Sequence, residues 1–180
     1  MHKLTLTLCA MALAAASTSA LAADEVTQGT VTFNGELTAS TCSIVSDSVD
    51  RQVQLPKVAI QTLSAAGTSA GSKGFDLNVE KCPAGITKVA AHFEAIGSSG
   101  VDSATGNLTN QYQGAGTKAT NVQVRLYNSD EQQLKLGDTG AAATVTGGKA
   151  TMRYYGGYYA TEKTTAGLVY AQARYTLVYP

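Results

Sequence analysis

The stretch Gly167-Leu-Val-Tyr-Ala-Gln-Ala-Arg-Tyr-Thr-Leu-Val-Tyr-Pro180 decides how the rest of this sequence is interpreted. Every second residue is apolar, and the set consists of Val169, Ala171, Ala173, Tyr175, Leu177 and Tyr179. The opposite face carries Arg174 and its polar neighbours Gln172 and Thr176. This period of two predicts a long strand with one face in a core.

The free edge of this predicted strand raises a question about its partner. The sequence ends one residue after the pattern, at Pro180, so we expect no later segment to pair with that edge. An apolar, unpaired edge is a template for another chain, and proteins normally protect it. We therefore expect that either an earlier segment of this chain or another polypeptide covers it.

The first 22 residues predict a secretory signal peptide. A short polar start precedes an apolar stretch over residues 4–16, and Ala20-Leu21-Ala22 has small residues at both positions that signal peptidase reads. The apolar stretch is too short to span a bilayer. We expect cleavage after Ala22 and a single exported domain over the remaining residues.

The predicted export determines how the cysteines are interpreted. Cys9 leaves with the signal peptide, so that Cys42 and Cys82 remain as a pair in an oxidising compartment. Such a pair predicts a disulfide. Two distant sulfurs and one remaining histidine do not make a metal ligand set, so we expect no metal and no cofactor.

Charge and composition exclude some partners. The 13 basic and 13 acidic residues balance, and no basic run or basic patch interleaved with aromatics is present. Nucleic acid is therefore not an expected partner. Charged residues make up only 14% of the chain, which suits an extracellular β-protein.

Short alternating segments recur along the exported chain. The first has small or apolar residues at odd positions, namely Thr27, Gly29, Val31, Phe33, Gly35 and Leu37, and polar residues between them. Further strands are predicted around Val53 and Leu55; Phe75, Leu77 and Val79; Val89, Ala91, Phe93 and Ala95; Val122, Val124 and Leu126; Leu134 and Leu136; and residues 149–155. We expect loops at residues 65–74 and 97–118 and one helical turn within residues 60–66. No sustained helical period is present, so the pattern predicts an all-β sandwich.

The sequence contains few residues that could carry out catalysis. His92 lies between Ala91 and Phe93, on the opposite face of a predicted strand, and is interpreted as a solvent-facing residue. Acidic residues are scattered and form no calcium-loop motif. We expect no catalytic residues and no enzymatic activity.

Two further motifs have ordinary explanations. Tyr154, Tyr155, Tyr158 and Tyr159 surround a Gly-Gly pair, and such rings can stack on sugars. No polar constellation accompanies them, so we interpret them as strand or interface residues. Asn107-Leu-Thr109 fits a glycosylation sequon, a tripeptide that is common by chance.

The chain resembles the chaperone–usher pilins, most closely the major shaft subunits of type 1 fimbriae. Gly29-Thr-Val-Thr-Phe-Asn-Gly-Glu36 looks like the N-terminal donor strand of that family. The order of Cys42, the alternating segments and Cys82 is similar to its disulfide framework. Gly167, fourteenth from the C-terminus, and the penultimate Tyr179 match its C-terminal motif, whereas the terminal Pro180 departs from it.

The resemblance implies an incomplete immunoglobulin-like β-sandwich that lacks its last strand. Residues 23–36 would be a donor-strand extension with Thr27, Gly29, Val31 and Phe33 facing a groove, and residues 37–180 would be the pilin domain. The groove and chaperone-contact strand would comprise Gly167, Val169, Tyr175, Leu177 and Tyr179. A periplasmic chaperone would lend this groove a strand, which an outer-membrane usher would replace with the arm of the next subunit.

The function that the resemblance implies is structural. The chain would polymerise with copies of itself and with related pilins into a fimbria on the cell surface that supports adhesion. A minor or adaptor pilin remains an alternative within the family. A secreted, self-contained sugar-binding β-sandwich is the alternative outside it.

Overall fold

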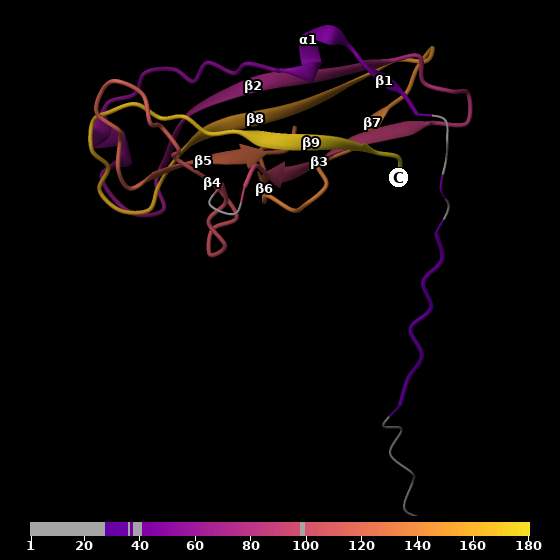
Figure 1. Cartoon of the computed structure of the whole chain (residues 1–180), viewed down its shortest axis with the longest axis horizontal. Helices are drawn as coiled ribbons and strands as arrows, with labels where there is room; N and C mark the ends of the chain where they lie inside the picture. Colours follow the sequence, from indigo (N-terminus) through magenta and orange to yellow (C-terminus); the bar gives the residue numbers. More distant parts are fainter. Residues whose placement is uncertain (1–27, 36, 38–40, 98–99) are drawn as a thin grey trace, which may run out of the picture. The chain divides into compact units, whose positions relative to one another are not determined.

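The computed structural model describes residues 28–35, 37, 41–97 and 100–180, which divide after Leu37 into an N-terminal unit and a body (Figure 1). In the N-terminal unit, residues 28–35 contain neither helix nor strand. The predicted signal peptide and Thr27 lie outside the described residues. All regular elements given below belong to the body.

Strands make up most of the regular secondary structure of the body, as the alternating pattern predicts. Its helical elements are one turn of α-helix and one of 3-10 helix, α1 (Ser46–Val49) and η1 (Ile60–Leu63). Its strands are β1 (Ser43–Ile44), β2 (Ser69–Glu80), β3 (Lys88–Ala95), β4 (Leu108–Thr109), β5 (Val122–Tyr127), β6 (Gln133–Leu134), β7 (Ala143–Thr144), β8 (Ala150–Ala160) and β9 (Ala173–Val178). The all-β fold class is thereby confirmed.

The strands form two sheets. The larger has the order β1-β2-β8-β5-β4, with β6 on β5, and the smaller has the order β7-β3-β9. All the pairs are antiparallel. Figure 1 shows the long strands β2 and β8 side by side along the body, with β9 beside β3.

The core lies between the two sheets. Its buried side chains come from alternate positions of the longest strands: Leu77 and Val79; Val89, Ala91 and Phe93; Leu126; Met152 and Tyr154. The ring of Tyr154 on β8 meets that of Phe93 on β3 edge to face, with centroids 5.1 Å apart. Aromatic pairs favour this arrangement, because the edge of one ring meets the electron-rich face of the other.

Two predicted boundaries were wrong. The expected loop at residues 65–74 is largely strand, because β2 starts at Ser69 and pairs with β8 from Tyr159 onward. Glycine allows this close pairing, since a Cβ at Gly74 would approach the ring of Tyr155 to 3.1 Å. The long loop at residues 97–118 includes the short strand β4, and the helical turn expected within residues 60–66 is confirmed as η1.

The strand predicted around Val53 and Leu55 is also wrong. In the described part of the chain, no main-chain hydrogen bond joins residues 51–58 to another segment. Val53, Leu55 and Val58 are nevertheless half-buried, whereas the residues between them are exposed. The alternating pattern therefore indicates that one face of residues 51–58 packs on the body, but it does not indicate a neighbouring strand.

Candidate strand-acceptor edge beside β9

Strand β9 forms one edge of the smaller sheet. It pairs along its length with β3, from Ala90 opposite Val178 to Ala95 opposite Ala173. No strand among the described residues pairs with its other side. The edge that the sequence pattern predicts is therefore present in the body.

The inward face of this edge is apolar and incompletely covered. Ala173, Tyr175 and Leu177 are half-buried and pack against the core, whereas Arg174 and Thr176 between them are exposed. By contrast, two inward residues of β8 inside the larger sheet are fully buried, since Met152 and Tyr154 are 1% and 0% exposed. The face of β9 thus looks like a core surface that lacks one neighbour.

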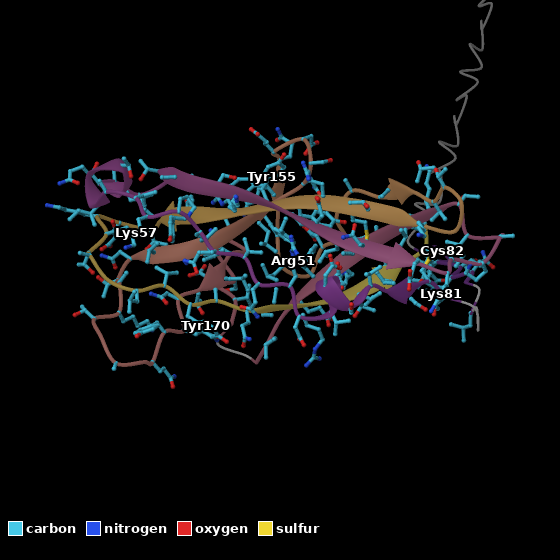
Figure 2. All side chains as sticks on the ribbon, turned by 90° about the horizontal axis from the view of Figure 1, so that it is seen from above. Arg51, Lys57, Lys81, Cys82, Tyr155 and Tyr170 are labelled. Carbon is cyan, nitrogen blue, oxygen red and sulfur yellow. A yellow bond between two sulfur atoms is a disulfide. The ribbon has the colours of Figure 1, made fainter. Side chains whose placement is uncertain are left out.

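Residues 49–62 form a second segment without a strand partner in the described chain, and they lie opposite this edge. Tyr175 is hydrogen-bonded to Ser48, and Thr164 is hydrogen-bonded to Leu63. These two hydrogen bonds are anchor points at which two segments meet, residues 49–62 and residues 165–174. The two segments run between the anchor points in opposite directions. Among the described residues, no hydrogen bond joins the two segments between these points. We call the space between them the slot. Figure 2 marks its extended wall by Arg51 and Lys57.

The backbone of residues 168–170 shows which side of the segment is free. Leu168 exchanges main-chain hydrogen bonds with Thr117 and Ala119. The N–H of Tyr170 donates to Asn110 Oδ1, and its carbonyl accepts from the N–H of Gln111. Alternate residues of an extended chain direct these groups to opposite sides. The groups of Val169 and Ala171 are therefore directed away from residues 110–119.

Two tyrosine hydroxyls of the C-terminal stretch contact the first segment of the body. Tyr175 Oη donates to the carbonyl of Ser48 at 2.8 Å, and the N–H of Cys42 donates to Tyr179 Oη at 2.9 Å. Burial, followed by the charges of Asp47 and Asp50, raises the pKa of the Tyr175 hydroxyl. Sequence reasoning identified both rings but missed these hydrogen bonds, which span 127 and 137 residues.

The predicted disulfide between Cys42 and Cys82 is confirmed. The sulfurs are 2.07 Å apart, and the bond joins the residue before β1 to the second residue after β2. Cys82 lies near one end of the body in Figure 2, whereas Lys57 and Tyr170 lie toward the other. The same cysteine whose N–H bonds Tyr179 is therefore covalently fixed to the larger sheet.

Gly167 and Val169 lie before β9 rather than within it. A Cβ at Gly167 would overlap the backbone nitrogen of Ala119, because the chain passes very close to residues 117–119 at this point. Glycine is required wherever two backbones approach this closely. The structure thus gives Gly167 a packing role beside the slot, and its predicted contact with an added strand stays a prediction.

The N-terminal unit presents the apolar face of the predicted donor strand. The side chains of Val31, Phe33 and Leu37 are 76%, 91% and 101% exposed. Gly29 has no described atom within 4 Å of the place where a Cβ would lie. The described parts of their own unit therefore do not pack against these alternate residues.

The tyrosines around Gly156-Gly157 do not form one site. They belong to β8, where successive side chains point to opposite faces. Tyr154 is buried in the core, whereas Tyr155 lies on the outer face beside Arg153. Tyr158 and Tyr159 are both half-buried, and the guanidinium of Arg125 lies over the ring of Tyr159. The structure offers no convergent aromatic platform that would favour sugar binding.

The sequon asparagine is enclosed by side chains. Asn107 is 0% exposed; its Nδ2 donates to Gln123 Oε1 at 2.9 Å, and its Oδ1 accepts from Arg125 Nε at 3.1 Å. Gln133 Nε2 also donates to this oxygen, at 3.0 Å. This network attaches the long loop to the larger sheet, so Asn107 is no glycosylation acceptor in the folded body.

The remaining candidates for chemistry have structural partners. His92 is half-buried, and its Nδ1 lies 3.1 Å from Thr139 Oγ1. Within the described ranges, no group of three His, Cys, Asp or Glu side chains could hold a metal ion. Those ranges also contain no helix long and apolar enough to cross a membrane.

Comparison with known proteins identifies the family. Residues 31–180 match the family described as fimbrial protein. The chain is 41% identical to the major fimbrial subunit SMF-1 of Stenotrophomonas maltophilia, with 93% of this chain and 99% of the relative covered. It is 39% identical to the F17 fimbrial protein of Escherichia coli, with 93% and 94% covered. It is 33% identical to a type-1 fimbrial protein A chain of Escherichia coli, with 93% of each covered.

Solved structures agree on the fold. A chaperone–usher pilus subunit matches with a TM-score of 0.61 at 20% identity, over 87% of this chain and 98% of that chain. The P pilus rod subunit PapA matches with a TM-score of 0.60 at 18% identity, over 78% and 100%. The body is thus an immunoglobulin-like β-sandwich with an unpaired edge, the architecture of a pilin. The chain belongs to the fimbrial protein family, which is a family of structural proteins and not of enzymes.

Proposed function

We propose that this chain is a structural subunit of a chaperone–usher fimbria that polymerises by accepting a strand in the slot beside β9. The observation that carries the proposal is the slot itself, with residues 49–62 and 165–174 joined only at its two ends among the described residues. An extended peptide would supply main-chain hydrogen bonds to both walls. Its alternate side chains would complete the half-buried face of Ala173, Tyr175 and Leu177.

The proposed occupant is the N-terminal arm of a second copy, residues 23–36. Its odd positions supply the small or apolar side chains of Thr27, Gly29, Val31 and Phe33, and the exposed Val31 and Phe33 have no use within their own described unit. Strand addition buries these side chains and pairs the free backbone groups at once. The resulting contact is head to tail, and it extends into a filament because each copy has one arm and one slot.

The proposal includes the route to the surface. Residues 1–22 direct export, a periplasmic chaperone lends a strand to the slot, and an outer-membrane usher exchanges it for the next subunit's arm. The product is a fimbria of this chain and related pilins at the cell surface that supports adhesion. The homology to fimbrial subunits over nearly the whole chain supports this assignment.

Gly29→Arg tests the arm. The substitution places a large charged side chain on the face that enters the slot, whereas the free subunit has open space at this position. We expect the variant to fold and to form the Cys42–Cys82 bond but to produce no SDS-resistant ladder of polymers. Fimbriae on the cells, counted by electron microscopy, should fall to background.

Thr30→Arg is the matched control, because it adds the same charge on the opposite face of the arm. It should leave the SDS-resistant ladder intact. Normal ladders from Gly29→Arg would contradict the proposal. Unfolding of the Gly29→Arg subunit would also contradict it, since the arm would then belong to its own domain.

A further inference from the structure

The end of the slot nearest the disulfide is closed by side chains. Tyr175 and Tyr179 extend from the C-terminal stretch on the smaller sheet to residues 42–48, whose strand β1 is the edge of the larger sheet. Both rings pack against the core and are half-buried. Their hydroxyl contacts therefore connect the two sheet edges between which an added strand would lie.

The hydroxyl contacts satisfy groups that would otherwise lack partners. Cys42 is 6% exposed, and its N–H has Tyr179 Oη as its acceptor. The carbonyl of Ser48, a residue that is 0% exposed, accepts from Tyr175 Oη. A buried donor that loses its partner is costly, so the tyrosines stabilise the closed arrangement until another chain supplies new partners.

Two cavities of the body lie away from β9. One is lined by residues of β2 and β8 together with Val45 and Thr144, and the other by residues 109–110 and 118–123 with Thr161. Neither includes a residue of β9.

We propose that Tyr175 and Tyr179 form a latch that holds this end of the slot shut in the free subunit and must open before a strand can be added. This inference rests on the proposed function and adds a step that controls its rate. A strand pairing with β9 lies about 4.8 Å from it, on the side of residues 42–48, so its insertion must break the two hydroxyl contacts. The main chain of the added strand can then supply a new acceptor for the Cys42 N–H and a new donor for the Ser48 carbonyl. The latch thus exchanges hydrogen bonds without leaving a buried group unpaired.

Tyr175→Phe and Tyr179→Phe test the latch, because each keeps the ring and removes only the hydroxyl. The acceptor is the purified subunit carrying Gly29→Arg, whose own arm is inactivated. The probe is a fluorescent peptide of residues 23–36, and its rate of uptake is followed by anisotropy. Each Phe variant should take up the peptide about 3- to 10-fold faster, the factor that corresponds to the loss of one hydrogen bond. Tyr127→Phe is the control, since Tyr127 lies on β5 away from the slot and none of the described residues bonds its hydroxyl, and it should leave the rate unchanged.

Hydrogen exchange supplies a readout that does not depend on uptake. The Cys42 amide should exchange about 3- to 10-fold faster in Tyr179→Phe and should keep its protection in Tyr127→Phe. Unchanged or slower uptake in both Phe variants, with normal uptake by the parent, would overturn the latch and leave the proposed function standing. Absence of uptake by the parent would overturn both. Unaltered exchange at Cys42 in Tyr179→Phe would also overturn the latch.

Discussion

At the scale of single residues, tyrosine hydroxyls connect the two sheets on both sides of the core. Tyr175 and Tyr179 do so beside the slot, and Tyr154 does so from β8. Tyr154 Oη donates to the carbonyl of Ala141 at 3.0 Å and accepts from the N–H of Ala91 at 3.2 Å. The latter N–H belongs to a fully buried residue of β3. Tyrosine suits these positions because its ring fills the core while its hydroxyl reaches a backbone group.

Tyr154→Phe should therefore destabilise the body even though it preserves the ring. The Ala91 N–H loses its side-chain acceptor in a site that water does not reach, at a cost of about 1–3 kcal/mol. Urea unfolding of the monomeric subunit measures this change in the free energy of unfolding. Tyr127→Phe is a suitable control, because no described residue bonds that hydroxyl. Equal stability of the two variants would show that the Tyr154 hydroxyl contributes nothing.

At the scale of elements, β8 and β9 carry the same alternation but differ in burial. Strand β8 lies between β2 and β5 in the larger sheet, and its inward residues Met152 and Tyr154 are fully buried. Strand β9 has β3 on one side only, and its inward residues remain half-exposed. The difference follows from the place of each strand in its sheet, since a neighbour on each side is needed to cover a face.

Leu177→Ala should consequently lower stability by an amount that differs between the free subunit and the polymer. In the free subunit the side chain is half-buried, so we expect a loss of about 1–2 kcal/mol, below the about 2–5 kcal/mol expected for the buried Met152→Ala. In the polymer an added strand covers Leu177, and its loss should approach that of Met152. Urea unfolding of the monomer and the temperature at which the polymer dissociates in SDS measure the two costs. A polymer as heat-resistant as the unmodified one would argue against burial of Leu177 on assembly.

At the scale of the whole body, one end is held by a covalent bond and by the latch together. The Cys42–Cys82 disulfide fixes the segment before β1 to the end of β2, and the N–H of the same Cys42 meets Tyr179. The first and last segments of the body are thereby tied to the larger sheet at one place. At the opposite end of the slot, the hydrogen bonds between Thr164 and Leu63 are the anchor that the described residues provide.

Removal of the disulfide should affect both stability and the latch. The double variant Cys42→Ser/Cys82→Ser opens a link across 40 residues, which corresponds to about 4 kcal/mol in the loop-entropy description. We expect a matching fall in the free energy of unfolding and a low level of the subunit in the periplasm. Cys9→Ser, which changes the predicted signal peptide, should leave the exported subunit unaltered in mass and stability. A double variant with unchanged stability would contradict this role of the disulfide.

Much of the fold could be predicted from the sequence because strand alternation is a local property. The faces of residues 169–177 were predicted by counting every second residue, and burial in the structure follows that count. The disulfide was predicted from the export signal and from the two cysteines that remain after it. Both inferences need only the order of residues and the compartment in which the chain folds.

The tertiary structure alone decided which alternating segments gain neighbours and which remain bare. Residues 51–58 and 173–178 have similar patterns, yet the former have no strand partner in the described chain and the latter have one. Likewise, Ser69–Gly74 has the composition of a loop but becomes strand because β8 lies beside it. The Tyr175 and Tyr179 hydroxyls find their partners 127 and 137 residues away. A periodic pattern fixes the direction of a side chain, whereas the partner that it meets depends on how distant segments of the chain are brought together.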